Sequence, residues 1–148
     1  MRLRIFLNGD KSARERFISL NFIFLRGEFD AILHYPFCFP VFFGLVDQST
    51  QRKHIIRKLS PDLFSRNYQR PQTDMTIAGE VLEFVPLEIL RQENNPYILD
   101  NTMFIRVMIN FNNMPDNLIP YAMNIDPALM NSLQQTMIEQ ERDKYSSV

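Results

Sequence analysis

The sequence predicts an all-β protein, an antiparallel β-sandwich followed by a helical tail. Several short apolar runs alternate with a period of two, which is typical of strands that bury one face. Turn-forming residues separate these runs at intervals of about 10–20 residues, as in sandwich folds. The chain has 148 residues, of which 45% are hydrophobic and 22% charged, so its length and composition fit one globular domain.

The clearest strand is expected at residues 102–112, "TMFIRVMINFN". Alternate positions carry apolar side chains, namely Met103, Ile105, Val107, Ile109 and Phe111. We therefore expect one face of this strand to be fully buried. The first run of the chain, "RLRIFLN", is similar and places Arg2, Arg4 and Phe6 on the face opposite its aliphatic side chains.

"FISLNFIFL", residues 17–25, predicts a longer strand whose inward side chains are Ile18, Leu20, Phe22 and Phe24. The aromatic stretch that follows, residues 27–48, is interrupted by Asp30, His34 and two prolines. A transmembrane helix needs about 20 uninterrupted apolar residues. We therefore expect no membrane insertion and interpret this stretch as a loop followed by a buried strand at Val41–Val46.

Two further strands are expected, a short one at Ile55–Ile56 and one at Val81–Val85 that Pro86 stops. "LEILRQENNP" predicts one helical turn, and "NNMPDNLIP" reads as a linker. A tail helix is then expected from Asp126, the plausible N-cap, with Pro127 in the first helical position. Its apolar stripe includes Met130, Leu133 and Met137.

Composition and residue types exclude several functions. The formal net charge of −1 offers no basic excess for nucleic acid. A single cysteine, Cys38, precludes an internal disulfide and a cysteine-based zinc site, and it favours a reducing, cytoplasmic setting. His34 and His54 form no recognisable metal site. Cys38 lies between two phenylalanines, so we expect an inert, buried or half-buried thiol, no catalytic residue and no cofactor.

Several fragments together resemble the C-terminal MATH domain of the tumour-necrosis-factor-receptor-associated factors, the TRAF family. They are "LRIFLNGD" at 3–10, "ISLNFIFLRGEFDAILHYPF" at 18–37, "LVDQS" at 45–49, "YQRP" at 68–71, "DMTIAG" at 74–79 and "YILDNTMFIRVMI" at 97–109. The resemblance covers about residues 2–113. It leaves residues 114–148 as a linker and amphipathic tail helix without a counterpart.

This resemblance implies an eight-stranded sandwich that binds peptides and catalyses no reaction. A short extended segment of a receptor tail or an adaptor would pair with a sheet edge, and its alternate side chains would fill pockets. The family's domains trimerise, so that weak contacts add by avidity. The implied function is that of a cytoplasmic signalling adaptor. The alternative is a MATH substrate-recognition module of a ubiquitin ligase or a deubiquitinase.

Carried over by position, the resemblance places a ligand-reading arginine at Arg4 and a nearby aspartate at Asp10. Phe6 stands where the family has a tyrosine and lacks its hydroxyl donor. Two positions of groove-lining aromatic residues are occupied by Leu59 and Asn21. Arg4 would lie on the outward face of its strand, where a planar cation can bind a carboxylate through two hydrogen bonds.

The family's serine cluster falls on Ser65, Arg66 and Asn67, so that only one serine remains. Gly79, on the presumed edge strand, would let another backbone approach closely. Arg66 adds a positive charge where the family has neutral hydroxyls. We therefore expect the groove to prefer a more acidic peptide than the family's usual ligand.

By this resemblance the chain begins inside the family's second strand. Losing a strand would remove on the order of 5–10 kcal/mol of buried apolar contact, which is comparable to the stability of about 5–15 kcal/mol of a native domain. Two explanations remain open at this point. Either the sequence is a fragment of a longer protein, or the tail helix folds back and replaces the lost core contacts with Met130, Leu133 and Met137.

Overall fold

The structure, a computed structural model, describes residues 1–126 and 128–146. Its strands are β1 (Arg2–Phe6), β2 (Phe17–Leu25), β3 (Val41–Leu45), β4 (Ile55–Leu59), β5 (Met75–Pro86) and β6 (Ile105–Ile109). Its α-helices are α1 (Leu87–Arg91), α2 (Ile119–Ala122) and α3 (Asn131–Ser146). Short 3-10 turns η1, η2 and η3 occupy Lys11–Ala13, Arg66–Tyr68 and Asp116–Leu118.

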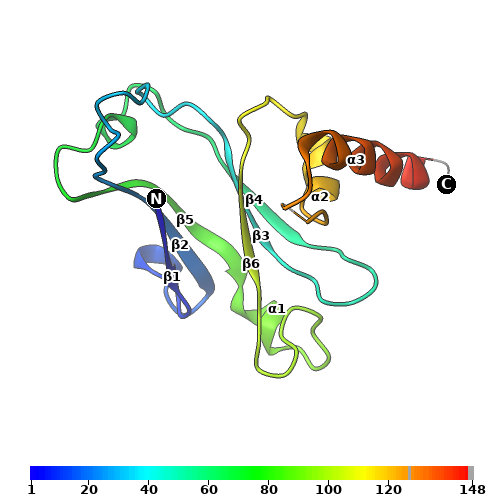
Figure 1. The fold of residues 1–148 in the computed structure, drawn as a ribbon. Helices are drawn as coiled ribbons and strands as arrows, with labels where there is room; N and C mark the ends of the chain where they lie inside the picture. Colours follow the sequence, from blue (N-terminus) through cyan, green and yellow to red (C-terminus); the bar gives the residue numbers. More distant parts are fainter. Residues whose placement is uncertain (127, 147–148) are drawn as a thin grey trace.

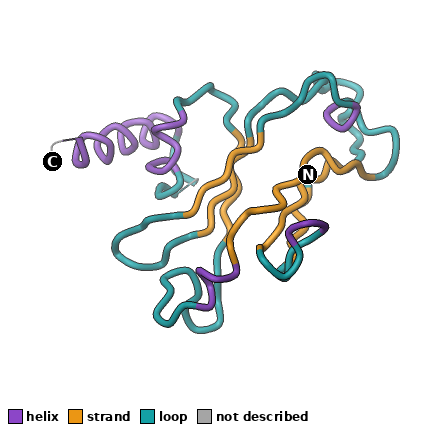
Figure 2. Tube along the Cα trace, turned by 180° about the vertical axis from the view of Figure 1, so that it is seen from behind, coloured by secondary structure: helices purple, strands orange, loops and turns teal. Residues whose placement is uncertain are grey.

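The strands form two three-stranded antiparallel sheets. Sheet A has the order β1-β2-β5, and sheet B has the order β4-β3-β6. Figure 1 shows the two sheets beside each other, with α2 and α3 beyond sheet B, and Figure 2 shows α3 extending away from both sheets. The predicted antiparallel sandwich with a helical tail is therefore confirmed.

The core lies between the inner faces of β2 and β3. The four predicted inward residues of β2 are all buried, because their alternation points them toward sheet B. Phe22 lies edge-to-face against Phe43 of β3, with ring centroids 6.1 Å apart. Phe24 packs in the same way on Phe37, at 5.1 Å. The prolines and phenylalanines of residues 27–48 thus belong to a loop and a buried strand, as predicted.

Two predicted strands have different limits or burial. β5 begins at Met75, earlier than the predicted start at Val81, and it extends through Pro86. β6 is shorter than predicted, and the expectation of a fully buried face is wrong. Val107 is 40% exposed, and Phe111, beyond the strand, is 58% exposed. The reason is that β6 lies at the end of sheet B, so only one neighbouring strand covers its side chains.

The segment predicted as a linker contains structure of its own. It forms η3 and α2, which pack on the outer face of sheet B, away from the core. Ile119 and Met123 are 1% and 2% exposed and lie against Phe42 of β3. Arg106 of β6 donates from Nη1 to the carbonyl oxygens of Met123 and Ile125. The linker is therefore part of the folded domain.

The tail helix begins later and packs differently from the prediction. α3 starts at Asn131, while Asp126 accepts a hydrogen bond from the Ala128 backbone in a turn before it. Pro127, the predicted first helical residue, lies outside the described residues. Of the two explanations left open above, the one in which the apolar stripe replaces core contacts is wrong. The side chains of Met130, Leu133 and Met137 are 70%, 46% and 39% exposed.

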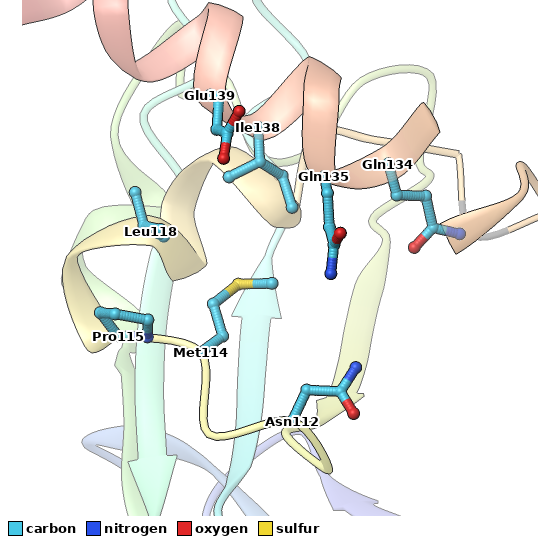
Figure 3. Close-up of a pocket in the computed structure, with 8 residues that line it drawn as sticks. All are labelled: Asn112, Met114, Pro115, Leu118, Gln134, Gln135, Ile138 and Glu139. Atoms are coloured by element: carbon cyan, nitrogen blue, oxygen red, sulfur yellow. The ribbon is translucent and has the colours of Figure 1, made fainter. Parts of the chain in front are cut away.

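The contact between α3 and the rest of the chain is made by another residue. Ile138 is only 5% exposed, and it lines a pocket of about 350 Å³ together with Met114 and Leu118. Figure 3 shows Ile138 and Gln135 pointing from α3 toward the segment that carries these two side chains. The tail therefore reaches sheet B through the 114–118 segment and α2.

The packing of α2 predicts a stability difference between two apolar tail residues. Ile119→Ala should lower the free energy of unfolding by about 2–4 kcal/mol, because it leaves a cavity against sheet B. Leu133→Ala is the matched control and should change it by no more than about 0.5 kcal/mol, because Leu133 is 46% exposed. Urea denaturation measures both, and equal losses would contradict this description of the tail.

Candidate functional site

Part of the predicted groove lies beside β5, which ends sheet A in the described chain. A pocket of about 610 Å³ lies there, between β5, the end of β4 and η2. Four of the predicted site residues line it: Leu59, Ser65, Asn67 and Gly79. Since no strand of the described chain pairs with the outer edge of β5, its backbone can accept an extended segment.

Gly79 allows close packing at this edge, but its neighbours differ from those predicted. A Cβ at Gly79 would lie 2.4 Å from Leu59 Cδ2 and 2.8 Å from the Tyr68 hydroxyl. The space that a side chain would fill is thus taken by two side chains of the domain itself. Leu59 and Tyr68 thereby form the wall between β4 and β5.

The hydroxyl of Ser65 has a structural partner. Ser65 is the N-cap of η2, and its Oγ accepts a hydrogen bond from the Asn67 backbone at 3.2 Å. Arg66 is exposed and does not line the pocket. Tyr68 is buried at the end of the same turn, and burial together with the charge of Asp62 raises its pKa. Tyr68 is therefore a neutral hydroxyl at neutral pH.

The outer face of sheet A carries a row of polar residues next to this edge. Arg4 lies opposite Asn21, and Asn21 lies opposite Glu80 of β5. Lys11 of η1 reaches Glu80, with Nζ 2.6 Å from each carboxylate oxygen, and it also lines the pocket. This hydrogen bond and the charge of Glu80 raise the pKa of Lys11. The row connects the first strand to the open edge.

Arg4 is the half-buried cation of this row. No ion pair of Arg4 occurs within the part of the chain that the structure describes. Phe6 follows it on the same face of β1 and is also half-buried. Asp10 caps η1 by accepting from the Lys11 backbone at 2.9 Å, and its own N–H donates to Ser19 Oγ. Arg4 thus has a guanidinium available to a ligand, whereas one carboxylate oxygen of Asp10 is already used by the cap.

Asn21 is placed differently from a groove-lining residue. It belongs to the central strand β2, is 2% exposed and does not line the pocket at β5. Its Oδ1 is buried and has no hydrogen-bond partner among the described residues. A buried acceptor without a donor costs about 1–3 kcal/mol.

Sequence reasoning missed the charged residues that line this pocket, Lys11, Asp62 and Glu80. Lys11 follows the predicted Asp10, and its exposed turn is the only signal that the sequence offers. Glu80 follows Gly79, but the pairing of Glu80 with Asn21 depends on the register between β2 and β5. That register shifts twice along β2, so the sequence alone does not give it.

The remaining candidates for chemistry are one cysteine and two histidines. Cys38 is exposed, so the predicted buried or half-buried thiol is wrong. His34 is exposed, and His54 lies between the Asp47 backbone N–H and Asn124. In the described ranges, no three histidine, cysteine or acidic side chains come together to hold a metal ion. Within the same ranges, no helix has the length and apolar character needed to cross a bilayer.

Comparison with known proteins agrees with this geometry. Residues 1–106 match the family model of the TRAF/meprin MATH domain. TNF receptor-associated factor 1 of Mus musculus is 40% identical over 108 residues, which are 73% of this chain and 26% of that protein. TNF receptor-associated factor 5 of Mus musculus is 37% identical over 113 residues, 76% of this chain and 20% of that protein. The chain therefore spans about a quarter or less of these curated relatives.

Among solved structures, TRAF5 of Notothenia coriiceps superposes with a TM-score of 0.68 at 31% sequence identity. The match covers 76% of this chain and 56% of that one. The arrangement of the two sheets is therefore the one found in that protein.

The packing around Gly79 predicts the effect of adding one methyl group. Gly79→Ala should lower the free energy of unfolding by about 1–3 kcal/mol, because Leu59 and Tyr68 must move. Gly27→Ala is the control and should be close to neutral, since the nearest atom to its Cβ is Asp30 Oδ1 at 3.6 Å. Thermal or urea denaturation compares the two. Adding Leu59→Ala to Gly79→Ala should recover part of the loss, and strict additivity would contradict the contact.

Proposed function

Because the chain belongs to the TRAF/meprin MATH domain family, we propose that it is the ligand-binding domain of a cytoplasmic signalling adaptor. Its ligands are short extended peptides from receptor tails or from other adaptors. The peptide pairs with the outer edge of β5, and the domain changes no covalent bond. Residues of the pocket beside β5 hold the peptide's side chains.

The observation that supports this proposal is an open edge on the same sheet as a cation that has no ion pair in the described chain. β5 ends its sheet in the described chain, and the polar row places Arg4 two strands away on the outer face. Main-chain hydrogen bonds to an edge strand give affinity, and pockets for alternate side chains give specificity. A peptide lying on this edge can therefore direct a carboxylate toward the row.

Two cations are available to that carboxylate. Arg4 has no ion pair in the described part of the chain, and its planar fork matches a carboxylate. Lys11 already binds Glu80, and the exposure of 56% of its side chain lets a ligand compete for it. Exposed ion pairs contribute only about 0–1 kcal/mol, so exchanging one carboxylate for another costs little. Phe6 and Asp10 would complete the acid-reading end.

The departures from the family's pattern set the ligand preference. Arg66 is exposed on η2 next to the pocket residues Ser65 and Asn67. A guanidinium at this position attracts a peptide with an additional acidic side chain. We therefore expect a preference for acidic peptides over glutamine-containing ones.

A single peptide contact of this kind is weak, and trimerisation would raise the overall affinity. In a longer protein the domain would act as a homotrimer that presents three grooves to clustered ligands. Linked binding events gain about 10²–10⁴ over a single affinity when the geometry allows simultaneous contact. The alternative, a substrate-recognition module of a ubiquitin ligase or deubiquitinase, uses the same groove. The similarity to TNF receptor-associated factors 1 and 5 supports the adaptor.

The role of Arg4 is tested by binding of an extended acidic peptide. Arg4→Ala should weaken this binding about tenfold or more, because a charge-assisted pair contributes about 1.5–3 kcal/mol. Arg14→Ala, an exposed arginine outside the groove, is the control and should change it less than about twofold. Isothermal titration calorimetry measures both. Equal affinities for wild type and Arg4→Ala would refute the proposed function.

The ligand preference is tested by removing the extra charge. Arg66→Ser should shift the preference from an acidic peptide toward a glutamine-containing peptide of the same length, by about threefold to tenfold in the ratio of affinities. The preference should also weaken as salt is added, because Arg66 is exposed. An unchanged ratio in fluorescence anisotropy would show that Arg66 does not read the ligand.

A further inference from the structure

A second pocket lies where β4 begins and β5 ends, away from the pocket beside Gly79. It has a volume of about 790 Å³ and shares no lining residue with the pocket beside Gly79. The seam between them is bridged by Arg57 of β4, whose Nε lies 3.4 Å from the Glu83 carbonyl oxygen of β5. The second pocket extends from the turn before β4 to Pro86 and Ile89, and it is closed by Pro120 and Asn124.

The charge of this pocket is one-sided. Arg52, Lys53 and Arg57 line it, and no aspartate or glutamate is among the described residues that do so. None of these three cations takes part in an ion pair within residues 1–126 and 128–146. The nearby Asp47 uses its carboxylate for the backbone N–H groups of Ser49 and Lys53, at 2.8 Å each. Arg52 and Lys53 are therefore available to a negatively charged ligand, whereas Arg57 donates to the carbonyl oxygens of Ile56 and Glu83.

The pocket is also apolar and well supported. Ile55, Ile89 and Pro120 contribute hydrophobic surface. The turn that carries the cations is held in place, because Asp47 binds the Lys53 N–H and the Tyr97 hydroxyl donates to the Lys53 carbonyl oxygen. A fixed turn loses little conformational entropy when it binds a ligand.

The tail helps to build this pocket. His54 Nε2 lies 2.7 Å from Asn124 Oδ1, which joins the turn before β4 to the segment after α2. The family match ends at residue 106, so the wall made by Pro120 and Asn124 lies outside it. The sandwich and its tail therefore form the pocket together.

We propose that this pocket, formed by the β4 edge and α2, is a second peptide site that binds an acidic extended segment with aliphatic side chains. β4 meets β5 at Arg57 and Leu59, so a peptide can lie along the turn before β4 and the first residues of β4. Its carboxylates would then meet Arg52 and Lys53, and an aliphatic side chain would enter between Ile55 and Ile89. Charge complementarity selects an acidic peptide over a basic one.

The site is tested with a blocked peptide of about ten residues that alternates glutamate with leucine, the length of an extended segment. Because this probe can also enter the groove beside Gly79, binding is measured on the full chain carrying Arg4→Ala. In that background, adding Arg52→Glu and Lys53→Glu should weaken binding about tenfold or more. Arg14→Glu with Arg26→Glu gives the same change in net charge away from both pockets and should change it less than about threefold.

The apolar part of the site has its own variant. Ile89→Asn, also in the Arg4→Ala background, should weaken binding about threefold to tenfold without changing the salt dependence. A probe with lysine in place of glutamate should not bind. Circular dichroism melting identifies a variant that fails to fold. If Ile89→Asn fails to fold, the Arg52→Glu, Lys53→Glu double variant tests the site, and if the double variant fails, Ile89→Asn does so.

The outcomes separate this site from the proposed function. Binding that Arg4→Ala leaves intact and that Arg52→Glu with Lys53→Glu removes supports the second site, even if the groove binds nothing. Complete loss of binding in Arg4→Ala alone overturns the second site and leaves the groove. Equal binding of the glutamate and lysine probes overturns it as well. A last measurement is cosedimentation of the protein with phosphatidylserine vesicles. If the protein binds the vesicles but not the peptide, and Arg52→Glu with Lys53→Glu abolishes vesicle binding, the peptide proposal is overturned and the ligand is a lipid surface.

Discussion

The packing of β2 on β3 is the contact on which the rest of the molecule depends. Every residue of β2 from Ile18 to Phe24 is buried, and all five residues of β3 are buried. These are the central strands of the two sheets, so their side chains join sheet A to sheet B. Edge-to-face rings such as Phe22 and Phe43 add about 0.5–1.5 kcal/mol to the burial of apolar area. With the centre fixed in this way, the remaining four strands are all edges.

That arrangement explains why the binding features lie where they do. On one side of the sandwich, β4 and β5 approach each other through Leu59 and Gly79 at one end and through Arg57 and Glu83 further along. A pocket lies at each end of this contact. One is lined by Asp62, the Lys11–Glu80 pair and neutral groups, and the other by cations that have no ion pair in the described chain. At the β1 edge of sheet A, Ile5 is 42% exposed, although Leu3 on the same face of β1 packs against the core. The two pockets therefore combine edge backbone with side chains of different charge.

The tail changes the exterior of the sandwich without adding to its core. α2 covers Phe42 and its neighbours on the outer face of sheet B, and Arg106 fixes the end of α2 through backbone carbonyl groups. The outer face of sheet A, with Arg4, stays uncovered by the tail, because the helices lie beyond sheet B (Figure 1). The domain can thus carry an additional helical layer while the groove beside Gly79 remains accessible.

The sequence by itself determined the approximate positions of the strands, the inward residues of β2 and the family, because alternation and local motifs act over a few residues. Only the tertiary structure decided that Asn21 is buried away from the groove, that Glu80 pairs with Lys11, and that the tail docks through Ile119 rather than through its apolar stripe. These features depend on strand register and on which sheet face is left uncovered. Both are set by contacts between residues far apart in the chain, which a local pattern does not encode.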